Sequence, residues 1–501
     1  MSDHKAEIYY YDIGDYLSRE QKLDIITNFK SMENLPFTRL TPNTHGDWLS
    51  QRNDKFGTWI PVEPDEKFNN KSHSFFTVNS RGYETARDFW VYASDEKSLR
   101  ENVNSFIEEY YRNLGKKDKS ELNYDTKKIS WSSNLIAKVL RGEKISKEVN
   151  VATAVYRPFF KQYTITKSEL INRRGQFDSF FPTSNSKNLV ICVSGLGGSK
   201  VNSSFIVDTI PDLNCLDSGT QCLPLYWYEV IEPDQHSLFG DDDAQIVKHE
   251  AISDFILERA QSKYGNKVQR EDIFYYVYGI LHSKSYRETF SADLKKMLPR
   301  IPLVSDYEKF WAFSKAGREL ANLHLNYESI APCPGVVVES LERAYYETPK
   351  QVRGDDDVAR GDSGVARSDS NYLAVAETPT KVVSTGSTTG GDYDYYEVQQ
   401  MKFPKKGQKD TILYNHWNTI KNIPEKAYEY VVNGKSAIEW IMERYAITTD
   451  KKSGITNNPN DWSREHEKPR YILDLLLSVI KVSVQTVDIV NNLPEVDWDK
   501  E

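Results

Sequence analysis

The stretch NLVICVSGLGGSK, residues 188–200, joins a run of five apolar residues to a turn that contains three glycines. A short apolar run that ends in such a turn predicts a β-strand, and SSFIVDTI, residues 203–210, predicts a second strand after the turn. After a loop, QCLPLYWYE, residues 221–229, has the pattern of a third strand. Strands are therefore expected to dominate the centre of the chain.

Helical patterns lie on both sides of this centre. Ser18 is placed to cap a helix over 18–29, and residues 97–114 repeat the helical spacing of apolar residues. After the strands, helices are predicted over 252–264, 272–283, 286–298 (with Phe290, Leu294 and Met297 on one face), 307–325 (with a stripe of Phe310, Phe313 and Leu320) and 470–493. The predicted fold class is α+β: a β-rich domain with flanking helices and a helical C-terminal region.

Composition divides the chain into four segments. Residues 1–145 form a mixed α/β segment, and 146–347 form the first part of the β-rich domain. Residues 348–395 are poor in apolar residues and rich in Gly, Ser, Thr and Asp, which predicts a disordered acidic insertion. Residues 396–501 complete the domain with helices, and the last eight residues, PEVDWDKE, are expected to fray.

The composition is ordinary for a globular protein, at 39% hydrophobic and 27% charged residues. No apolar run reaches the length of a membrane span, and MSDHKAEIYYYD lacks the basic-then-apolar order of a signal peptide, so we expect a cytoplasmic protein. The four cysteines form no Cys-x-x-Cys pair, which favours free thiols in a reducing compartment.

The charge is unevenly distributed. The net charge is −9, but residues 354–400 alone hold nine acidic and three basic residues. Basic residues outnumber acidic ones four to one over 161–175 and seven to four over 266–300. Local positive patches can coexist with an acidic total, so the net charge does not exclude a nucleic-acid partner.

The glycine turn does not match a nucleotide-binding loop. A Walker A loop ends in Lys-Ser/Thr, whereas Lys200 is followed by Val201, and Lys200 also occupies the third glycine position of the dinucleotide fingerprint. Ser194 lacks the flanking glycines of a nucleophile elbow. The second resemblance, NGKS at 433–436, has Glu429 where the first Walker glycine belongs. Both stretches are interpreted as turns, one of which opens a helix.

Motifs for other chemistry are equally incomplete. Pro211-Asp212 and Asp293-Leu294-Lys295 satisfy the letters of a metal-dependent nuclease, but so short a pattern arises by chance, and Asp293 and Lys295 stand two apart on a predicted helix. No histidine or cysteine pattern has metal-ligand spacing, and no Asn/Asp-Pro-Pro-Tyr/Phe methylation signature occurs. We therefore predict no catalytic residues and no metal ligands in this chain.

Several phrases together resemble one family. They succeed one another from about residue 8 to about residue 494, interrupted mainly by the insertion after Thr348: TPNTHGDWLSQRNDKF, SRGYETARDFWVY, YRPFFKQY, DTIPDLNCLDSGTQCLPLYWYE, DIFYYVYGILHSKSYRETFSADLKKMLPRIPL, FWAFSKAGRELANLHLNYE, YEYVVNGKSAIEWIMERY and TDKKSGITNNPNDW. This ordered set is similar to the C-terminal part of type ISP restriction-modification enzymes, which join a nuclease, a helicase-like ATPase, an adenine-N6 methyltransferase and a target-recognition domain.

The resemblance covers only the region C-terminal to the methyltransferase motifs. It implies a sequence-specific reader of double-stranded DNA, with residues 1–145 similar to the segment between methyltransferase and reader. S-adenosylmethionine, ATP and magnesium are then expected only on missing or partner domains. The alternative is a structural subunit that docks a methyltransferase-helicase partner, and a third hypothesis is an enzyme in its own right.

A reader of this kind needs basic groups for phosphates and Arg, Asn, Gln or Ser side chains for base edges. The candidates for DNA contact are Arg173, Arg174, Ser199, Lys200, Asn202, Ser283, Lys284 and Arg287, followed by Arg81 in a Ser-Arg-Gly turn and by Arg87. In this hypothesis the glycine amides and Lys200 meet a backbone phosphate. The alternative for each basic residue is an ordinary solvated surface position.

Overall fold

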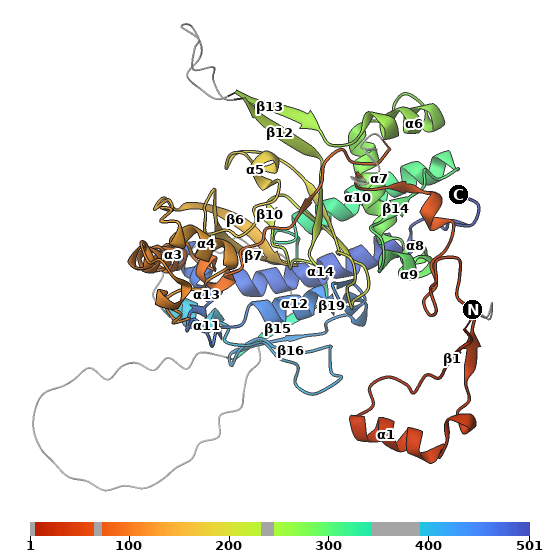
Figure 1. The fold of residues 1–501 in the computed structure, drawn as a ribbon, viewed down its shortest axis with the longest axis horizontal. Coiled ribbons are helices and arrows are strands. Elements are labelled where there is room, and N and C mark those ends of the chain that lie inside the picture. The colour runs from red at the N-terminus through yellow and green to blue at the C-terminus, as the bar shows by residue number, and fades with distance from the viewer. Residues whose placement is uncertain (1–5, 65–72, 232–244, 342–390) are drawn as a thin grey trace, which may run out of the picture.

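The computed structural model describes residues 6–64, 73–231, 245–341 and 391–501. Helices and several small sheets occur together along the chain, which confirms the α+β prediction (Figure 1). The insertion predicted over 348–395 lies outside the described residues except for its last five, which belong to helix α11 (Gly391–Tyr396).

The stretch 188–210 builds the central sheet. Its strands, in spatial order, are β4 (Ser80–Arg81), β11 (Gln221–Pro224), β8 (Val190–Val193) and β9 (Ser204–Val207), all paired antiparallel. The predicted pair of strands joined by the glycine turn is confirmed. Every residue of β8 is buried, which is why this strand is a continuous apolar run rather than an alternating one.

Successive residues of β8 enter two different hydrophobic cores. Val190 and Cys192 belong to the first core, whereas Ile191 and Val193 belong to the second. Because side chains alternate between the faces of a strand, the central sheet separates the two cores and is covered on both sides.

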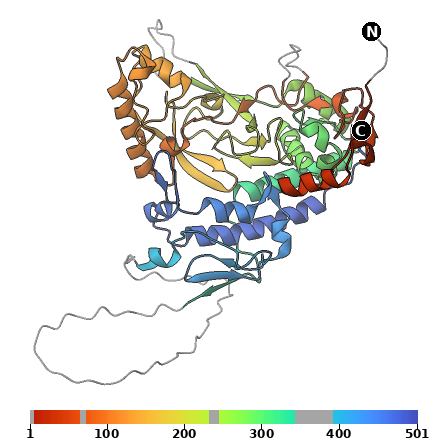
Figure 2. The ribbon, with the colours of Figure 1, turned by 60° about the horizontal axis from the view of Figure 1, so that its bottom comes forward.

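The first core contains a second four-stranded sheet and most of the C-terminal helices. In spatial order its strands are β10 (Ile210–Pro211), β6 (Asn150–Arg157), β7 (Phe160–Thr166) and β5 (Tyr92–Ala93). Its helices include α3 (Glu96–Asn113), α4 (Ser133–Leu140), α12 (Ala437–Arg444) and the long α14 (Tyr471–Asn491). Figure 2 shows α14, in dark blue, crossing the fold with lighter-blue C-terminal elements below it.

The second core is mainly helical. Helices α6 (Asp254–Tyr264), α7 (Arg270–His282) and α10 (Tyr307–Leu325) carry it, and the predicted stripe on α10 is fully buried. Helices α7 and α10 approach closely at two glycines, because a Cβ on Gly317 would stand 1.9 Å from the Tyr275 carbonyl oxygen. No helix in the described ranges is long and apolar enough to cross a membrane.

Two local predictions were wrong. The helix predicted over 286–298 is two short helices, α8 (Lys284–Thr289) and α9 (Ser291–Leu294), because Phe290 leaves helical geometry at φ −104° and ψ 23°. The C-terminal tail does not fray: Trp498 is 4% exposed and packs 5.6 Å from the Tyr286 ring and 5.9 Å from the Trp59 ring. Aromatic burial across long sequence separations fixes both segments.

Small two- and three-stranded sheets and short helices complete the described fold. They are β3 (Ile60–Pro61) with β14 (Arg300–Ile301), β12 (Tyr226–Ile231) with β13 (Gln245–Glu250), β15 (Val337–Ser340) with β17 (Asn418–Lys421) and β16 (Ile412–Leu413), β18 (Val431–Val432) with β19 (Lys435–Ser436), β20 (Thr448–Thr449) with β21 (Thr456–Asn457), α2 (Asp88–Val91), α5 (Phe177–Phe180) and α13 (Asn460–Glu465). The turn between β18 and β19 is the NGKS stretch, and Ser436 then caps α12, as predicted.

The N-terminal segment projects from the body (Figure 1). Strands β1 (Ile8–Tyr10) and β2 (Thr38–Leu40) form an isolated two-stranded sheet around α1 (Arg19–Asn28), whose predicted Ser18 cap is confirmed by a capping box with Gln21. No residue of α1 is buried. This segment therefore adds little to either core.

Candidate nucleic-acid interface

A groove of about 880 Å³ lies at one end of the central sheet. It is lined by residues of 61–64, 79–84, 173–176 and 296–300 and by Leu196 of the glycine turn. Four of the lining residues are basic, namely Arg81, Arg173, Lys296 and Arg300, whereas two are acidic, Glu63 and Glu84. Three candidates that are far apart in the sequence, Arg81, Arg173 and the glycine turn, are thus gathered at one concave surface.

Two turns that each contain Arg-Gly, at Arg81-Gly82 and at Arg174-Gly175, meet at the floor of the groove. Arg173 and Glu84 exchange backbone hydrogen bonds of 3.0 Å in both directions, and the Gln176 amide donates to Ser80 Oγ at 3.0 Å. Gly175 has φ +61°, and a Cβ there would stand 2.3 Å from Ser80 Oγ. The contact between the turns therefore requires glycine at 175 and fixes where the neighbouring arginines emerge.

Arg81 is the least restrained cation of the groove. Its exposed guanidinium makes no hydrogen bond or ion pair with any residue that the structure describes, and a Cβ on Gly219 would meet its Nη2 at 2.6 Å. On β11, Gln221 is the residue paired with Arg81. An exposed arginine beside a glutamine at a strand end offers donors suited to base edges in a major groove.

The other cations have carboxylate or carbonyl partners. Arg173 lies 3.7 Å from Glu84, and Arg174 lies 3.0 Å from Asp178. Lys296 lies 2.7 Å from Asp47, whose pKa is held well below its usual range because Arg52 and Lys296 donate to it.

Lys296 and Arg300 were not among the predicted contacts. Arg300 donates to the Trp59 carbonyl oxygen at 2.9 Å. The excess of basic residues over 266–300 is the signal that indicated this region, but it did not single out these two.

The glycine turn is held by the protein itself. The Gly195 amide donates to the Asp217 carbonyl oxygen at 2.9 Å, and the Gly197 amide donates to the Lys295 carbonyl oxygen at 3.0 Å. The Lys200 amide donates to Asp217 Oδ2 at 3.1 Å. These three amides are already used, so any phosphate at this turn must be met by side chains or by the remaining amides of Leu196, Gly198 and Ser199.

The glycine turn and the NGKS turn, which both resemble phosphate-binding loops, contact each other. A Cβ on Gly434 would lie 3.1 Å from Lys200 Cδ, so the lysine stem crosses the NGKS turn. The Asn433 amide donates to Ser203 Oγ at 2.9 Å. Ser199 and Lys200 are exposed, whereas Asn202 is only 9% exposed. Asn202 is thus a packing residue of the turn in this conformation.

The candidates Ser283, Lys284 and Arg287 lie at a different place. Ser283 is 3% exposed and caps α8 by accepting from the Tyr286 amide. Lys284 is exposed and donates to Asn491 Oδ1 at 2.7 Å. Lys284 and Arg287 line a small cavity that is separate from the groove.

Arg87 lies in the interior and not at the groove. It is 4% exposed and donates to Ser132 Oγ at 2.8 Å, to the Ser130 carbonyl at 3.3 Å and to the Leu170 carbonyl. Burial lowers the pKa of Arg87 to about 10. The side chain ties three segments of the first core together, which the local sequence Ala86-Arg87-Asp88 does not reveal.

The nuclease-like motif does not assemble into one site. Asp212 is buried and pairs with Arg157 at 2.7 Å, and burial raises the pKa of Asp212 to about 6. Asp293 accepts from the Asn53 amide at 3.1 Å. Within the described ranges, no group of three or more His, Cys, Asp or Glu side chains is arranged to hold a metal ion.

Solved structures similar to this chain are DNA complexes. A nuclease-deletion mutant of the Type ISP restriction-modification enzyme LlaGI, in complex with a DNA substrate mimic, is 34% identical over 99% of this chain, with a TM-score of 0.75. The ATP-dependent Type ISP enzyme LlaBIII, bound to DNA, is 36% identical over 99% of this chain, with a TM-score of 0.78. A DrdV-DNA complex is 26% identical over 97% of this chain, with a TM-score of 0.72.

The chain spans less than half of each of these structures, namely 40% of LlaGI, 28% of LlaBIII and 43% of DrdV. No curated protein matches it. The family model for the Type ISP C-terminal specificity domain matches residues 74–475. The match includes both Arg-Gly turns, the glycine turn and the cavity that holds Lys284 and Arg287. The chain therefore belongs to the Type ISP C-terminal specificity domain family.

Proposed function

We propose that this chain is the sequence-specific double-stranded DNA reader of a type ISP-like restriction-modification system. The observation that carries the proposal is the groove, where Arg81, Arg173, Lys296 and Arg300 converge from three parts of the chain. The DNA in the LlaGI and LlaBIII structures supports a nucleic-acid ligand for this fold.

Different cations of the groove have different roles in this proposal. Arg81 reads a base edge, because its guanidinium is exposed, unpaired within the described residues and adjacent to Gln221. Arg173 and Lys296 meet phosphates and release their carboxylate partners in exchange. Phosphate contacts set position and base contacts set sequence preference, so the two kinds of variant should differ in their effects.

The test is fluorescence anisotropy of the full chain on randomised and selected duplexes. Binding should weaken steeply between about 50 and 200 mM salt, and Arg173→Gln should weaken it on all sequences alike. Arg81→Gln should reduce the difference between the selected and the random duplex. Arg141→Gln, an exposed arginine paired with Glu143, is the matched control. Absence of binding at about 50 mM salt would exclude the proposal.

A second function, docking of a methyltransferase-helicase partner, is favoured by the N-terminal segment. Its large apolar side chains face solvent: Tyr16 is 105% exposed, Met32 73% and Trp48 57%. Leu23 and Ile26 of α1 are also about half exposed. Apolar side chains grouped in this way on a projecting segment are typical of an interaction surface.

Docking is tested by co-purification with the methyltransferase-helicase polypeptide of the same system. Leu23→Glu with Ile26→Glu should abolish co-purification and leave DNA affinity unchanged. Loss of DNA affinity with retained co-purification would instead place DNA contact on the segment. In this proposal S-adenosylmethionine, ATP and magnesium bind to the partner domains, and the chain itself performs no chemistry.

A further inference from the structure

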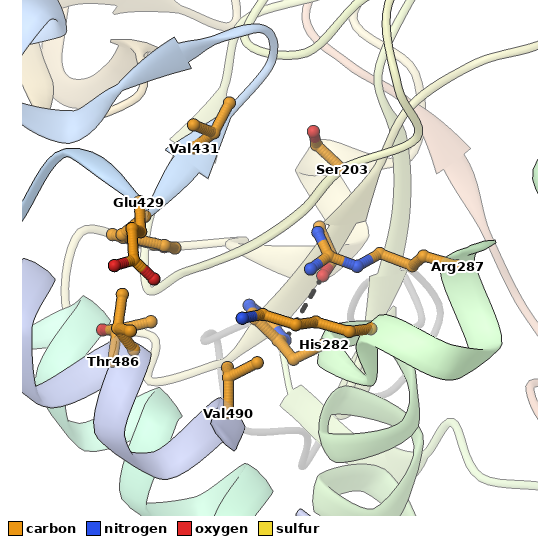
Figure 3. Close-up of a pocket in the computed structure, with 11 residues that line it drawn as sticks. Ser203, His282, Arg287, Glu429, Val431, Thr486 and Val490 are labelled. Atoms are coloured by element: carbon orange, nitrogen blue, oxygen red, sulfur yellow. Dashed lines mark hydrogen bonds between the residues drawn. The ribbon is translucent and has the colours of Figure 1, made fainter. Parts of the chain in front are cut away.

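A small cavity of about 90 Å³ lies between the glycine turn and the C-terminal helix. Ser203 and Ser204 form one wall, His282 to Arg287 a second, Glu429 to Val431 a third, and Thr486 to Val490 of α14 a fourth. In Figure 3, Arg287 and Glu429 reach in from opposite sides. The cavity is thus closed by parts of the chain that are up to about 290 residues apart.

Arg287 has no counter-ion in this cavity. Its side chain makes no hydrogen bond and no ion pair within the part of the chain that the structure describes, and its Nε is buried without a partner. Burial lowers the pKa of the Arg287 guanidinium. The residue as a whole is half-buried. A partly enclosed cation that lacks both a carboxylate and hydrogen-bond acceptors is costly, and an anion beside it would offset that cost.

Lys284 adds a second positive charge at the rim. Its ammonium donates to the amide oxygen of Asn491 at 2.7 Å, and no carboxylate of the described residues pairs with it. Glu429 also lines the cavity but forms no ion pair with Lys284 or Arg287. The two cations therefore have no direct ion-pair partner, and the cavity holds two positive charges against one carboxylate.

Neutral donors surround the same space. The hydroxyl of Tyr430 is buried and has no partner among the described residues. Burial lowers the pKa of His282 to about 3, and its Nδ1 lies 2.9 Å from the Tyr278 carbonyl oxygen, so the neutral ring carries its proton on Nδ1. The Ser204 hydroxyl lies 3.4 Å from the same nitrogen and is free to donate elsewhere.

We propose that this cavity binds a single phosphate group through Arg287 and Lys284, with the hydroxyls of Tyr430 and Ser204 as further donors. Charge-assisted hydrogen bonds from arginine and lysine to phosphate oxygens are the strongest that this set of donors can make. A volume of about 90 Å³ excludes a nucleotide, because sites for ligands of that size are several times larger.

The phosphate can come from a DNA backbone or from inorganic phosphate in solution. The proposal does not rest on the DNA-reading function, because the unpaired cations are a property of the cavity and not of the groove. The experiment therefore begins without DNA, on the full chain, with inorganic phosphate as the probe and chloride at matched ionic strength as the reference.

The melting temperature should rise saturably with phosphate in the wild-type chain, since a ligand that binds only the folded state stabilises it. Arg287→Met should raise the melting temperature in phosphate-free buffer, because it removes a half-buried charge that has no ion-pair partner, and should abolish the rise with phosphate. If Arg287 only stabilised the fold, Arg287→Met would instead lower the melting temperature in phosphate-free buffer. No phosphate-dependent rise in the wild type up to roughly 50 mM would overturn the proposal.

Lys284→Gln tests the site without altering the interior. Lys284 is exposed, so the variant should fold, and its phosphate affinity should fall about tenfold through loss of one charge-assisted hydrogen bond. Lys315→Gln on α10, an 80% exposed lysine that does not line this cavity, is the control and should bind phosphate like the wild type. Equal affinities of the two variants would also contradict the proposal.

DNA titrations then identify the source. If the site takes a backbone phosphate, Arg287→Met lowers the slope of log affinity against log salt by about 1 on every duplex, and free phosphate competes with DNA. If the site takes inorganic phosphate, Arg287→Met leaves DNA affinity unchanged while still abolishing the thermal effect. Both results support a phosphate site, and they remain distinct from a failure of DNA binding at the groove.

Discussion

The groove and the cavity hold arginines under opposite conditions. At the groove, Arg173 is exposed and lies within 4 Å of a carboxylate, as does the neighbouring Arg174. In the cavity, Arg287 is largely enclosed and has no carboxylate partner among the described residues. Exposed ion pairs are screened and exchange partners at little cost, whereas an enclosed lone cation favours one occupant strongly. The groove is thus suited to a ligand whose phosphates replace the carboxylate partners, and the cavity to a single group.

The largest expected effect tests whether the cavity excludes water from His282. The pKa of His282 is about 3 in the fold, below its ordinary value near 6.5, so the unfolded chain binds the additional proton. This contribution to stability is complete above about pH 6.5 and is lost as the pH falls towards 3, a loss of about 4 kcal/mol.

Urea unfolding between pH 7 and 4 measures this loss. His282→Gln should flatten the pH dependence by up to about 1.4 kcal/mol per pH unit below pH 6. His324 remains in the variant and acts in the same direction, because burial also lowers its pKa. An unchanged slope would mean that water reaches His282, and the contrast between an open groove and a closed cavity would fail.

The next effect tests the turn that both regions share. A Cβ on Gly195 would stand 2.1 Å from the Ser218 carbonyl oxygen, so Gly195→Ala should cost about 2–3 kcal/mol of unfolding free energy. Gly57→Ala is the control, because a Cβ on Gly57 would have nothing within 4 Å of it. Similar urea midpoints for the two variants would contradict the close approach. Gly195→Ala should also weaken both DNA and phosphate binding, because the groove and the cavity border the same turn.

The smallest effect separates two arginines inside the groove region. Arg81→Gln should cost about 1–2 kcal/mol of DNA binding, roughly tenfold in affinity, on the preferred sequence. Arg174→Gln should cost less than about threefold, because Arg174 is already paired with Asp178. Dissociation constants at one fixed salt concentration measure both. Equal losses of DNA affinity in the two variants would show that an ion pair with a carboxylate does not reduce the contribution of an arginine to DNA binding.

Local sequence patterns predicted the helices and strands but not how they pack against one another. The strands of 188–210 followed from an apolar run and a glycine turn, and α1, α10 and α14 followed from caps and apolar spacing. These signals act over a few residues. The break at Phe290 and the burial of Trp498 depend on aromatic partners more than 200 residues away, and no local pattern carries that information.

The site shows the same limit. Arg81 and Arg87 stand six residues apart and were both candidates for DNA contact, yet one is exposed at the groove and the other is 4% exposed in the first core. Lys284 and Arg287 were predicted as candidates for DNA contact, but their place at a small cavity depends on Tyr430 and α14. Sequence therefore indicated which residue types take part, while tertiary packing decided which of them face a ligand.

The central sheet limits how the DNA preference of such a chain could be changed by engineering. Because β8 sends alternate side chains into both cores, both faces of the sheet at the groove are packed, and a strand or loop exchanged there would disturb one core or the other. The second core also draws on Phe56 and Trp498, which lie near opposite ends of the chain. A chimera between two relatives should therefore transplant the whole of residues 56–498, and retargeting within one chain should proceed through side chains at the rim, such as Arg81 and Gln221, rather than through loop grafts.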